Sequence, residues 1–298
     1  MRITKKFGII GSVPFLDVHV DRDNLLFLHP TAIRNGLHQD LATRASARIA
    51  SFTTEVIRCR ESPHLVDGVK GRALLRSGLN EPNETRLGYT REGSKGHGWG
   101  PGLGSHLWKE LDSPLCRRGL LTNIEHLPLF IPRVGDDLIS DMTTRLAMPE
   151  LVEFTSLMVR DYPVLGAVMR RAALTVWDSD ELRWTRLDTI LPFMGGKHLV
   201  LLPKSWVSKK LPMYSRQFYN RFTTDDVQHE RVSYIEGRAL VPLKRDLNRE
   251  FPKVLQFNTT QTLKAADKGR NLVRLYDRFA DTAFQALPDE EIIKRIAA

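Results

Sequence analysis

The sequence is poor in cysteine, with only Cys59 and Cys116 among 298 residues. Two thiols are too few for a disulfide framework or for a zinc site built from cysteine. Long apolar runs are also missing, because no window approaches the roughly 18 uninterrupted apolar residues that a membrane-spanning helix needs. The first apolar run meets Pro14 and Asp17 too soon for a secretory leader. We therefore expect a protein of the reducing cytoplasm without a membrane segment.

The sequence has no internal repeat, no low-complexity tract and no Ser/Gly linker. Its hydrophobic fraction of 42% and charged fraction of 27% are those of a folded chain, long enough for one large domain or two small ones. Helices and short strands alternate without βαβ regularity, which predicts an α+β fold around one main core. We expect residues 1–255 to form the main α+β domain and residues 256–298 to form a helical C-terminal region packed on it.

Hydrophobic spacing and turn residues predict the individual elements. The expected elements are a β-hairpin over 13–30, a helix over 40–61, a loop over 77–106 followed by a helix with Leu107 and Trp108, a buried extended segment over 127–134, a helix from 149 to 162, a hairpin over 174–187, a buried strand over 199–202, a helix over 260–287 and a short terminal helix from 289.

Positive charge is in excess, with 44 Lys and Arg against 35 Asp and Glu, a net charge of +9. A basic surface attracts polyanions, because binding releases counterions that are condensed on them. On the helix predicted over 260–287, Lys264, Lys268, Arg270 and Arg274 lie largely off the apolar stripe. They would contact a nucleic-acid backbone, or else form an ordinary solvated helix face. Nucleic acid is the expected partner, and a protein partner or a second copy of the chain stays open.

A glycine-rich segment covers residues 93–104, where six of the twelve residues are glycine. Such a loop can hold phosphate through its backbone N–H groups, which predicts Gly96, Gly98, Gly100 and His97 as phosphate-binding residues. The segment is not a Walker A motif, because no Gly-Lys-Ser/Thr follows a four-residue spacer. The alternative interpretation is a surface loop, or glycines that permit close packing.

The acidic run 136–141 is the best candidate for a metal site. Asp137 and Asp141 follow the predicted extended segment, and Mg²⁺ or Mn²⁺ prefers carboxylate oxygens. Glu84 is expected as a further ligand or base, and Lys95 or Lys204 as the cation that stabilises transition-state charge. The spacing departs from the short strand with acid-x-lysine that restriction-type nucleases use. The alternative is that these acids make a turn and cap a helix.

A second set of possible metal ligands alternates along one stretch. Asp17, His19, Asp21 and Asp23 occupy every second position, so that several of them could share one strand face. No glycine or late glutamate completes a calcium loop, and residues 21–24 are also typical of a turn. We expect the turn.

Four segments together resemble a family of uncharacterised bacterial proteins. They are Leu26–Pro30 (LFLHP), Glu81–Gly88 (EPNETRLG), Gly135–Thr143 (GDDLISDMT) and Leu201–Val207 (LLPKSWV). They span most of the chain, which indicates one evolutionary unit. The resemblance implies no named activity and no catalytic residue, and it only suggests phage defence as a setting.

The leading hypothesis from the sequence is a metal-dependent nuclease or phosphodiesterase that acts on DNA or RNA. It is motivated by the two polar loops and by the positive charge. One alternative is a non-catalytic regulatory subunit that binds nucleic acid or protein. A second alternative is a nucleotide-binding switch protein, in which the glycine-rich loop closes on a triphosphate.

Overall fold

The structure is a computed structural model that describes residues 1–88, 101–210 and 212–297. Helices dominate this part of the chain, and its strands form three small antiparallel sheets, which confirms the α+β class. The helices are α1 (Ile3–Phe7), α2 (Pro30–Asn35), α3 (Gln39–Glu61), α4 (Leu65–Arg76), α5 (Pro101–Glu110), α6 (Pro114–Arg117), α7 (Leu127–Phe130), α8 (Asp136–Leu146), α9 (Met148–Asp161), α10 (Ser215–Phe218), α11 (Thr224–Glu230), α12 (Lys244–Glu250), α13 (Val254–Asp267), α14 (Leu272–Ala283) and α15 (Asp289–Ala297).

Short helical turns and strands complete the list. The turns are the 3₁₀ helices η1 (Asn83–Thr85), η2 (Ile124–His126), η3 (Pro163–Val168) and η4 (Lys204–Trp206), and the π-helix η5 (Tyr219–Thr223). The strands are β1 (Phe27–Leu28), β2 (Met169–Asp178), β3 (Arg183–Met194), β4 (Lys197–His198), β5 (Val207–Ser208), β6 (Ser233–Ile235) and β7 (Arg238–Leu240).

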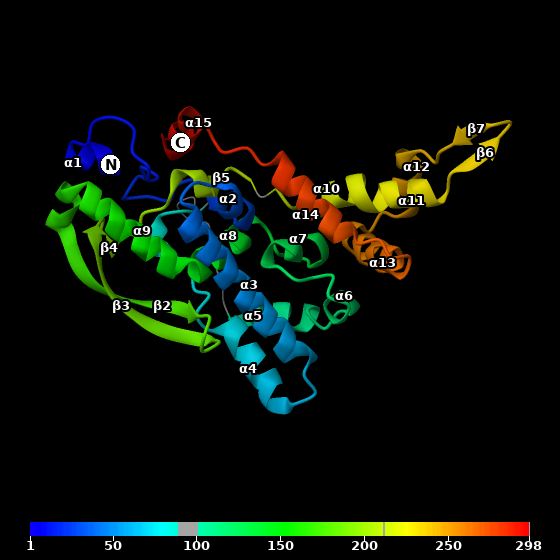
Figure 1. Ribbon diagram of the computed structural model, residues 1–298, viewed down its shortest axis with the longest axis horizontal. Helices are drawn as coiled ribbons and strands as arrows, with labels where there is room; N and C mark the ends of the chain where they lie inside the picture. Colours follow the sequence, from blue (N-terminus) through cyan, green and yellow to red (C-terminus); the bar gives the residue numbers. More distant parts are fainter. Residues whose placement is uncertain (89–100, 211, 298) are drawn as a thin grey trace.

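Helices α3, α8 and α9 form the centre of the molecule, and the long β2–β3 ribbon curves past them (Figure 1). In α8 every residue from Leu138 to Leu146 is buried. The C-terminal helix α15 lies beside α1, so the two ends of the chain are neighbours (Figure 1). At the opposite end of the molecule the β6–β7 hairpin projects away from the body (Figure 1).

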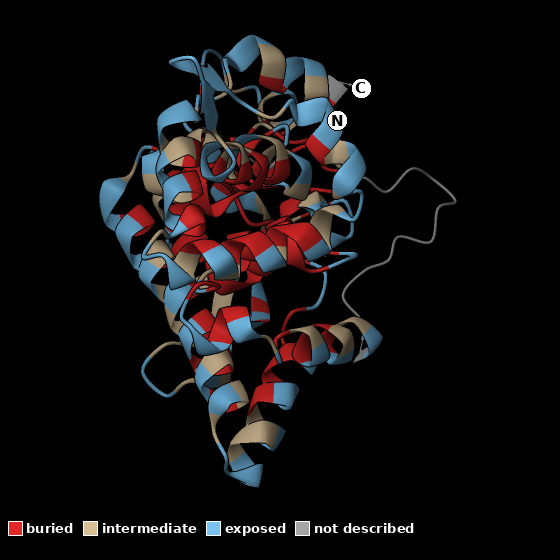
Figure 2. Cartoon of the chain, turned by 90° about the vertical axis from the view of Figure 1, so that its right-hand side faces the viewer, coloured by how far each residue is buried: buried red, intermediate tan, exposed pale blue. Residues whose placement is uncertain are grey.

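One large hydrophobic core extends from Ile3 to Ile296 and includes side chains of α14 and α15. Buried residues accordingly fill the middle of the molecule, whereas exposed residues cover its ends (Figure 2). A second, smaller cluster lies next to the projecting hairpin, and its members are Tyr219, Val227, Leu247 and Phe257. The buried Asn258 side chain connects the two parts, because its amide donates to the carbonyls of Leu129 and Ser215. The C-terminal helices therefore pack on the main body.

The hairpin predicted over 13–30 is wrong. Only Phe27 and Leu28 form a strand there, and they pair with β5 rather than with the preceding segment. The side chain of Asn24, fully buried, accepts a hydrogen bond from the His19 N–H and donates to the His19 and Arg86 carbonyls. These bonds satisfy the backbone groups that a strand ladder would otherwise use, so the segment folds as an irregular turn.

Two further predicted extended segments are also wrong. Residues 127–130 form the helix α7, because Pro128 fits the first turn of a helix and all four side chains are buried. As a result, α8 follows a turn and not a strand. Residues 199–202 are buried as expected but form no strand. Their backbone groups instead form separate hydrogen bonds outside any sheet. The Leu201 N–H, for example, donates to Thr155 Oγ1.

The helix predicted over 260–287 is two helices, α13 and α14. Gly269 adopts a positive φ of 75° between them, a conformation that glycine reaches without strain. The Asn271 side chain then caps α14 by accepting from the Arg274 N–H. The apolar stripe continues across the break, with Val273, Tyr276 and Ala280 buried, which explains why the sequence resembles one helix.

The other predicted elements are present in the structure. Helices α3, α9 and α15 and the β2–β3 hairpin lie where hydrophobic spacing and turn residues placed them, although the ribbon is longer than expected. Helix α5 contains the expected Leu107 and Trp108 but begins at Pro101, so Gly102 and Gly104 are helical rather than part of a loop. No helix among the described residues is long and apolar enough to cross a membrane.

Candidate functional site

The four segments that carry the family resemblance meet around α8. The Leu28 N–H donates to Ser140 Oγ at 3.0 Å, and Leu28 is paired with Val207 of β5. The Val200 N–H, just before the fourth segment, donates to the Glu84 carbonyl at 2.9 Å. Helix α8 is thus the element on which the other three segments are assembled, and its polar face is the candidate site.

Arg145 of α8 holds the segment that contains Glu81 and Glu84. Its guanidinium donates to the carbonyls of Asn80 and Glu81, each at 2.6 Å, and lies 3.1 Å from a carboxylate oxygen of Glu84. The Arg145 side chain is 9% exposed and that of Glu84 is 19% exposed. Such a nearly buried arginine with carbonyl and carboxylate partners fixes the loop on the helix. The Glu84 carboxylate is therefore neutralised by Arg145.

A second buried arginine, Arg86, fixes the neighbouring turn. Its guanidinium donates to the carbonyls of Val20, Asn83 and Met194 at 2.7 to 3.0 Å. Its backbone has a positive φ of 57°, rare for a residue with a side chain, and these bonds hold it there. The Asn24 side chain also donates to the Arg86 carbonyl. The turn that carries Asp23 is therefore held next to the segment that contains Arg86.

Asp137 and Asp141 lie four residues apart on α8, so their side chains share one face of the helix. Asp141 is 7% exposed, while Asp137 is exposed to solvent. Neither carboxyl group makes a hydrogen bond or an ion pair with a described residue. An almost buried carboxyl group without a partner is costly unless it binds a proton or a cation.

The electrostatic environment identifies two more acidic neighbours. Burial, followed by the charges of Asp137 and Glu81, raises the pKa of Asp141 to about 8, and Arg145 only partly opposes this shift. Partial loss of solvent contact, followed by the charge of Asp23, raises the pKa of Asp137. Asp23, Glu81, Asp137 and Asp141 therefore form one cluster, which we call the acidic cluster.

The donor chemistry of the acidic cluster fits Mg²⁺ or Mn²⁺, since both favour carboxylate oxygens. Within the described ranges, however, no three Asp, Glu, His or Cys side chains are already arranged around one point as a metal site. Mg²⁺ usually keeps several waters and binds through one or two carboxylates. A hydrated cation on Asp141 and Asp137 fits this arrangement, whereas a closed protein cage does not.

The predicted lysines are not part of the acidic cluster. The Nζ of Lys204 lies 2.7 Å from the Asp289 carboxylate and 3.0 Å from Ser12 Oγ, so it attaches α15 to the N-terminal segment. Lys95 lies outside the described residues, and so do the predicted phosphate-binding residues Gly96, His97, Gly98 and Gly100. Of the predicted catalytic set, the structure brings together Asp137 and Asp141, with Glu84 held nearby by Arg145.

The basic residues predicted on the C-terminal helices differ in their surroundings. Lys268 lies 2.6 Å from Glu230, and Arg270 pairs with both Asp226 and Glu230. Lys264 and the side chain of Arg274 are exposed and have no ion pair with a described residue. Two of the four basic residues predicted to bind nucleic acid are thus engaged in ion pairs within the chain.

The alternating acidic stretch at the N-terminus is divided between different partners. Asp17 accepts hydrogen bonds from the N–H and hydroxyl of Thr4. Asp21 lies 2.6 Å from the amino group of Met1, which also contacts His19. Of this stretch, only Asp23 is an electrostatic neighbour of both Asp137 and Asp141.

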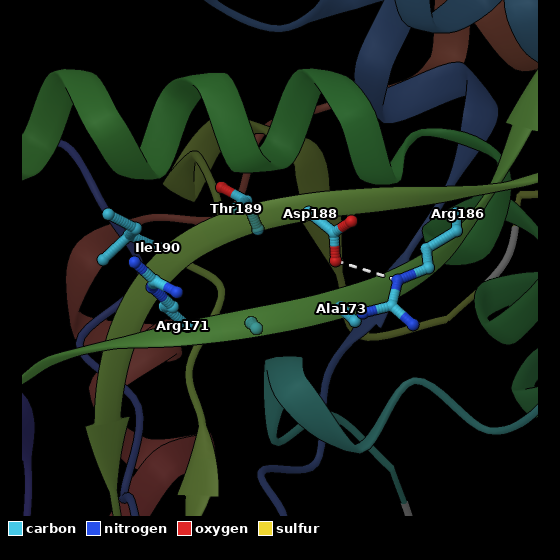
Figure 3. A pocket seen from close by; sticks show the side chains of 7 residues that line it. Arg171, Ala173, Arg186, Asp188, Thr189 and Ile190 are labelled. Carbon is cyan, nitrogen blue, oxygen red and sulfur yellow. Dashed lines mark hydrogen bonds and ion pairs between the residues drawn. The ribbon is translucent and has the colours of Figure 1, made fainter.

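A shallow groove of about 610 Å³ lies over the outer face of the β2–β3 ribbon (Figure 3). Arg171, Ala173 and Ile190 line it, and Arg186 forms a 2.8 Å ion pair with Asp188 there (Figure 3). Both members of this pair are more than 70% exposed. A solvated, internally paired surface contributes little to binding, so the acidic cluster remains the better candidate site.

The sequence interpretation missed Glu81 and Arg145 as parts of the site. Glu81 opens the second resemblance segment, yet only the bonds from Arg145 to the neighbouring carbonyls reveal that it faces α8. The available signal was the arginine four residues after Asp141, which on a helix lies next to it. That signal required α8 to be recognised as a helix beginning at Asp136.

Comparison with known proteins places this site within a segment that one family model matches. No curated protein and no solved structure matches the chain. A family model described as a domain of unknown function, DUF8370, matches residues 8–215. The match includes all four resemblance segments and every member of the acidic cluster, and it ends at the first residue of α10. The chain therefore belongs to the DUF8370 family.

Proposed function

We propose that the chain is a Mg²⁺- or Mn²⁺-dependent phosphodiesterase that cleaves nucleic acid, with Asp141 and Asp137 as cation ligands. One observation carries the proposal: Asp141 is almost buried beside Asp137 and has no hydrogen-bond or ion-pair partner among the described residues. The buried arginines nearby are satisfied, as both Arg86 and Arg145 bond to several carbonyls. A nearly buried carboxyl group that no described residue satisfies is expected to serve a ligand.

Of the other residues of the site, Arg145 would position the acidic groups and Glu81 would act as the general base. Arg145 keeps Glu81 next to Asp141 by holding the carbonyls of residues 80 and 81. The cation, when bound, would activate water and stabilise the charge that develops on a phosphodiester. Glu81 is exposed. It could accept a proton from an attacking water that the cation holds. The excess positive charge of the chain favours a polyanionic substrate.

Purified full-length protein should be incubated with plasmid, single-stranded DNA and RNA in the presence of Mg²⁺, Mn²⁺ or EDTA. We expect cleavage that EDTA and Asp141→Asn both abolish. Asp180→Asn is the matched control, because Asp180 is an exposed carboxylate on the β2–β3 turn, far along the chain from the cluster. Intact substrates in every lane, from protein verified as folded, would contradict the proposal.

A non-catalytic nucleic-acid-binding regulator is the second candidate. It is favoured by the absence of three preassembled metal ligands in the described part of the chain. Salt-sensitive binding without turnover under either metal would support it. The glycine-rich segment that suggested a nucleotide-binding switch lies outside the described residues.

We further propose that the protein works in the cytoplasm. Cys59 and Cys116 are both free thiols and both buried. Free buried thiols suit a reducing compartment, in which disulfides rarely persist. Detection of the tagged protein in the periplasmic or secreted fraction of its host would contradict this placement.

A further inference from the structure

The projecting hairpin β6–β7 and the helix α12 that follows it form an arm, which we define as residues 231–253. The arm lies beyond residues 8–215, the part of the chain that the family model matches. Its turn is tight, because Glu236 and Gly237 both have positive φ, as a two-residue turn between twisted strands requires. All six residues of the two strands are exposed, so the hairpin extends into solvent on both faces.

Large apolar side chains are concentrated on this hairpin and remain at least half exposed, or nearly so, among the described residues. Tyr234 is 72% exposed, Ile235 60% and Leu240 49%. The register pairs Tyr234 with Ala239 and Ile235 with Arg238, which places Tyr234 on one face and Ile235 with Leu240 on the other. An isolated two-stranded hairpin is only marginally stable in water. Contiguous exposed apolar side chains of this kind mark an interaction surface.

Positive charge is also concentrated on the arm. Residues 231–253 contain six Lys and Arg against three Asp and Glu, which is one third of the net charge of the chain within 23 residues. The side chain of Arg238 has no hydrogen-bond or ion-pair partner among the described residues. On α12 the side chains of Arg245 and Arg249 are 69% and 75% exposed and share Asp246 as their acidic neighbour. The partner of the arm should therefore be anionic.

The base of the arm is held firmly, so it can present these side chains in a defined direction. Arg231 forms two bonds of 2.6 and 2.8 Å with Glu250, and Gln228 donates to the Pro242 carbonyl at 2.6 Å. Leu247 anchors α12 in the smaller hydrophobic cluster. A ribbon fixed at its base and exposed along its length is the shape that enters a groove of a nucleic-acid duplex.

We propose that the arm binds double-stranded DNA, with the hairpin in a groove and the arginines of α12 on the phosphates. Apolar side chains such as Ile235 and Leu240 would pack against base edges or between base steps, and Arg238 would contact the backbone beside them. The inference rests on the proposed function only in taking nucleic acid as the substrate. It assigns the docking of that substrate to the arm rather than to the ion-paired Lys268 and Arg270.

Another exposed apolar patch provides a control. Leu65, Val66 and Val69 on α4 are 62 to 84% exposed, but the surrounding residues 61–72 contain two basic and two acidic side chains. This patch resembles the arm in exposure and differs from it in charge. Arg72 on α4 is exposed and has no partner among the described residues, so it matches Arg238.

The test measures fluorescence anisotropy of a short labelled DNA duplex with the full-length protein in EDTA, over a range of salt concentrations. We expect Arg238→Ala to weaken binding and to reduce the magnitude of the negative slope of log affinity against log salt by about 1. The double variant Ile235→Ser with Leu240→Ser should weaken binding about tenfold and leave that slope unchanged. Arg72→Ala and Val66→Ser should bind as the unmodified protein does. Circular dichroism verifies the fold of each variant.

Several outcomes would overturn the inference. They are a protein that does not bind duplex, arm variants that bind like the unmodified protein, and α4 variants with an equal loss. Arm variants that change sedimentation or binding to anionic vesicles, without changing DNA affinity, would instead assign the arm to another chain or to a lipid surface. Because EDTA prevents metal-dependent cleavage, duplex binding without any later turnover would refute only the proposed phosphodiesterase, whereas cleavage that is independent of the arm would refute only the arm.

Discussion

Asp141 and Arg145 lie one turn apart on α8, yet they do not form an ion pair. The guanidinium of Arg145 instead bonds to the carbonyls of Asn80 and Glu81 and to the carboxylate of Glu84. A cation that could have neutralised Asp141 is thus committed to the loop beside it. This arrangement gathers acidic groups and leaves Asp141, almost buried, without a hydrogen-bond or ion-pair partner in the part of the chain that the structure describes.

Arg145→Met should destabilise the protein by about 3 kcal/mol, because it removes the bonds to the carbonyls of Asn80 and Glu81 and leaves the Glu84 carboxylate without its cation. The measurement is urea unfolding followed by circular dichroism. Arg160→Met is the control, since Arg160 is 72% exposed and pairs only with its neighbour Asp161, and should change the unfolding free energy by less than about 0.5 kcal/mol. An equal effect of both changes would contradict the conclusion that Arg145 fixes the loop with Glu81 and Glu84 on α8.

Asp141→Asn should stabilise the protein at alkaline pH. The pKa of this carboxyl group is about 8 in the folded protein and about 3.8 ordinarily, so between these values the folded state binds a proton that the unfolded state has lost. The contribution of Asp141 to stability therefore falls as pH rises from about 4 to 8 and stays low above. The asparagine variant lacks this loss.

The melting temperature of Asp141→Asn, relative to the unmodified protein, should thus increase from pH 5 to about pH 8 and level off above it, measured without divalent cations. The corresponding difference in the free energy of unfolding between the two proteins is on the order of a few kcal/mol at high pH. Asp180→Asn should show no such trend, because Asp180 is exposed in both states. A relative melting temperature that is flat with pH would refute the protonated state assigned to Asp141.

Mg²⁺ or Mn²⁺ should raise the melting temperature of the unmodified protein, because a ligand that binds only the folded state stabilises it. The increase should be larger at pH 8 than at pH 6, since the cation competes with the proton for Asp141. Differential scanning fluorimetry with and without EDTA measures it. Asp141→Asn should abolish the cation effect, and Glu81→Gln should reduce it. Lys204→Ala should retain the effect, because Lys204 binds Asp289 rather than the acidic cluster.

The class of fold and several of the longer helices could be predicted from local patterns, because amphipathic spacing acts within a few residues. Helix α3 is an example, with Leu41, Ala45, Ile49 and Phe52 all buried at their predicted spacing. The errors arise where distant contacts decide the conformation. Asn24 takes its bonds from residues 19 and 86, and no local pattern near residue 24 shows that.

The candidate site was predictable only in part for the same reason. Asp137 and Asp141 are close in sequence and were recognised together. Glu81 reaches them only through Arg145, a contact across more than sixty residues. Lys204 looked equally suitable as a catalytic cation, and only its position beside Asp289 separates it from the cluster.

Two glycines of α5 should respond in opposite ways to alanine, although they lie two residues apart. A Cβ on Gly104 would collide with the carbonyl of Leu75 on α4, so that Gly104→Ala should destabilise the protein by about 1 to 3 kcal/mol. A Cβ on Gly102 would meet no atom, and the higher helix propensity of alanine should make Gly102→Ala neutral or stabilising by up to about 1 kcal/mol. Urea unfolding of both variants measures the difference. Equal destabilisation would mean that α5 does not pack on α4 at Gly104, and the close-packing explanation of these glycines would then fail.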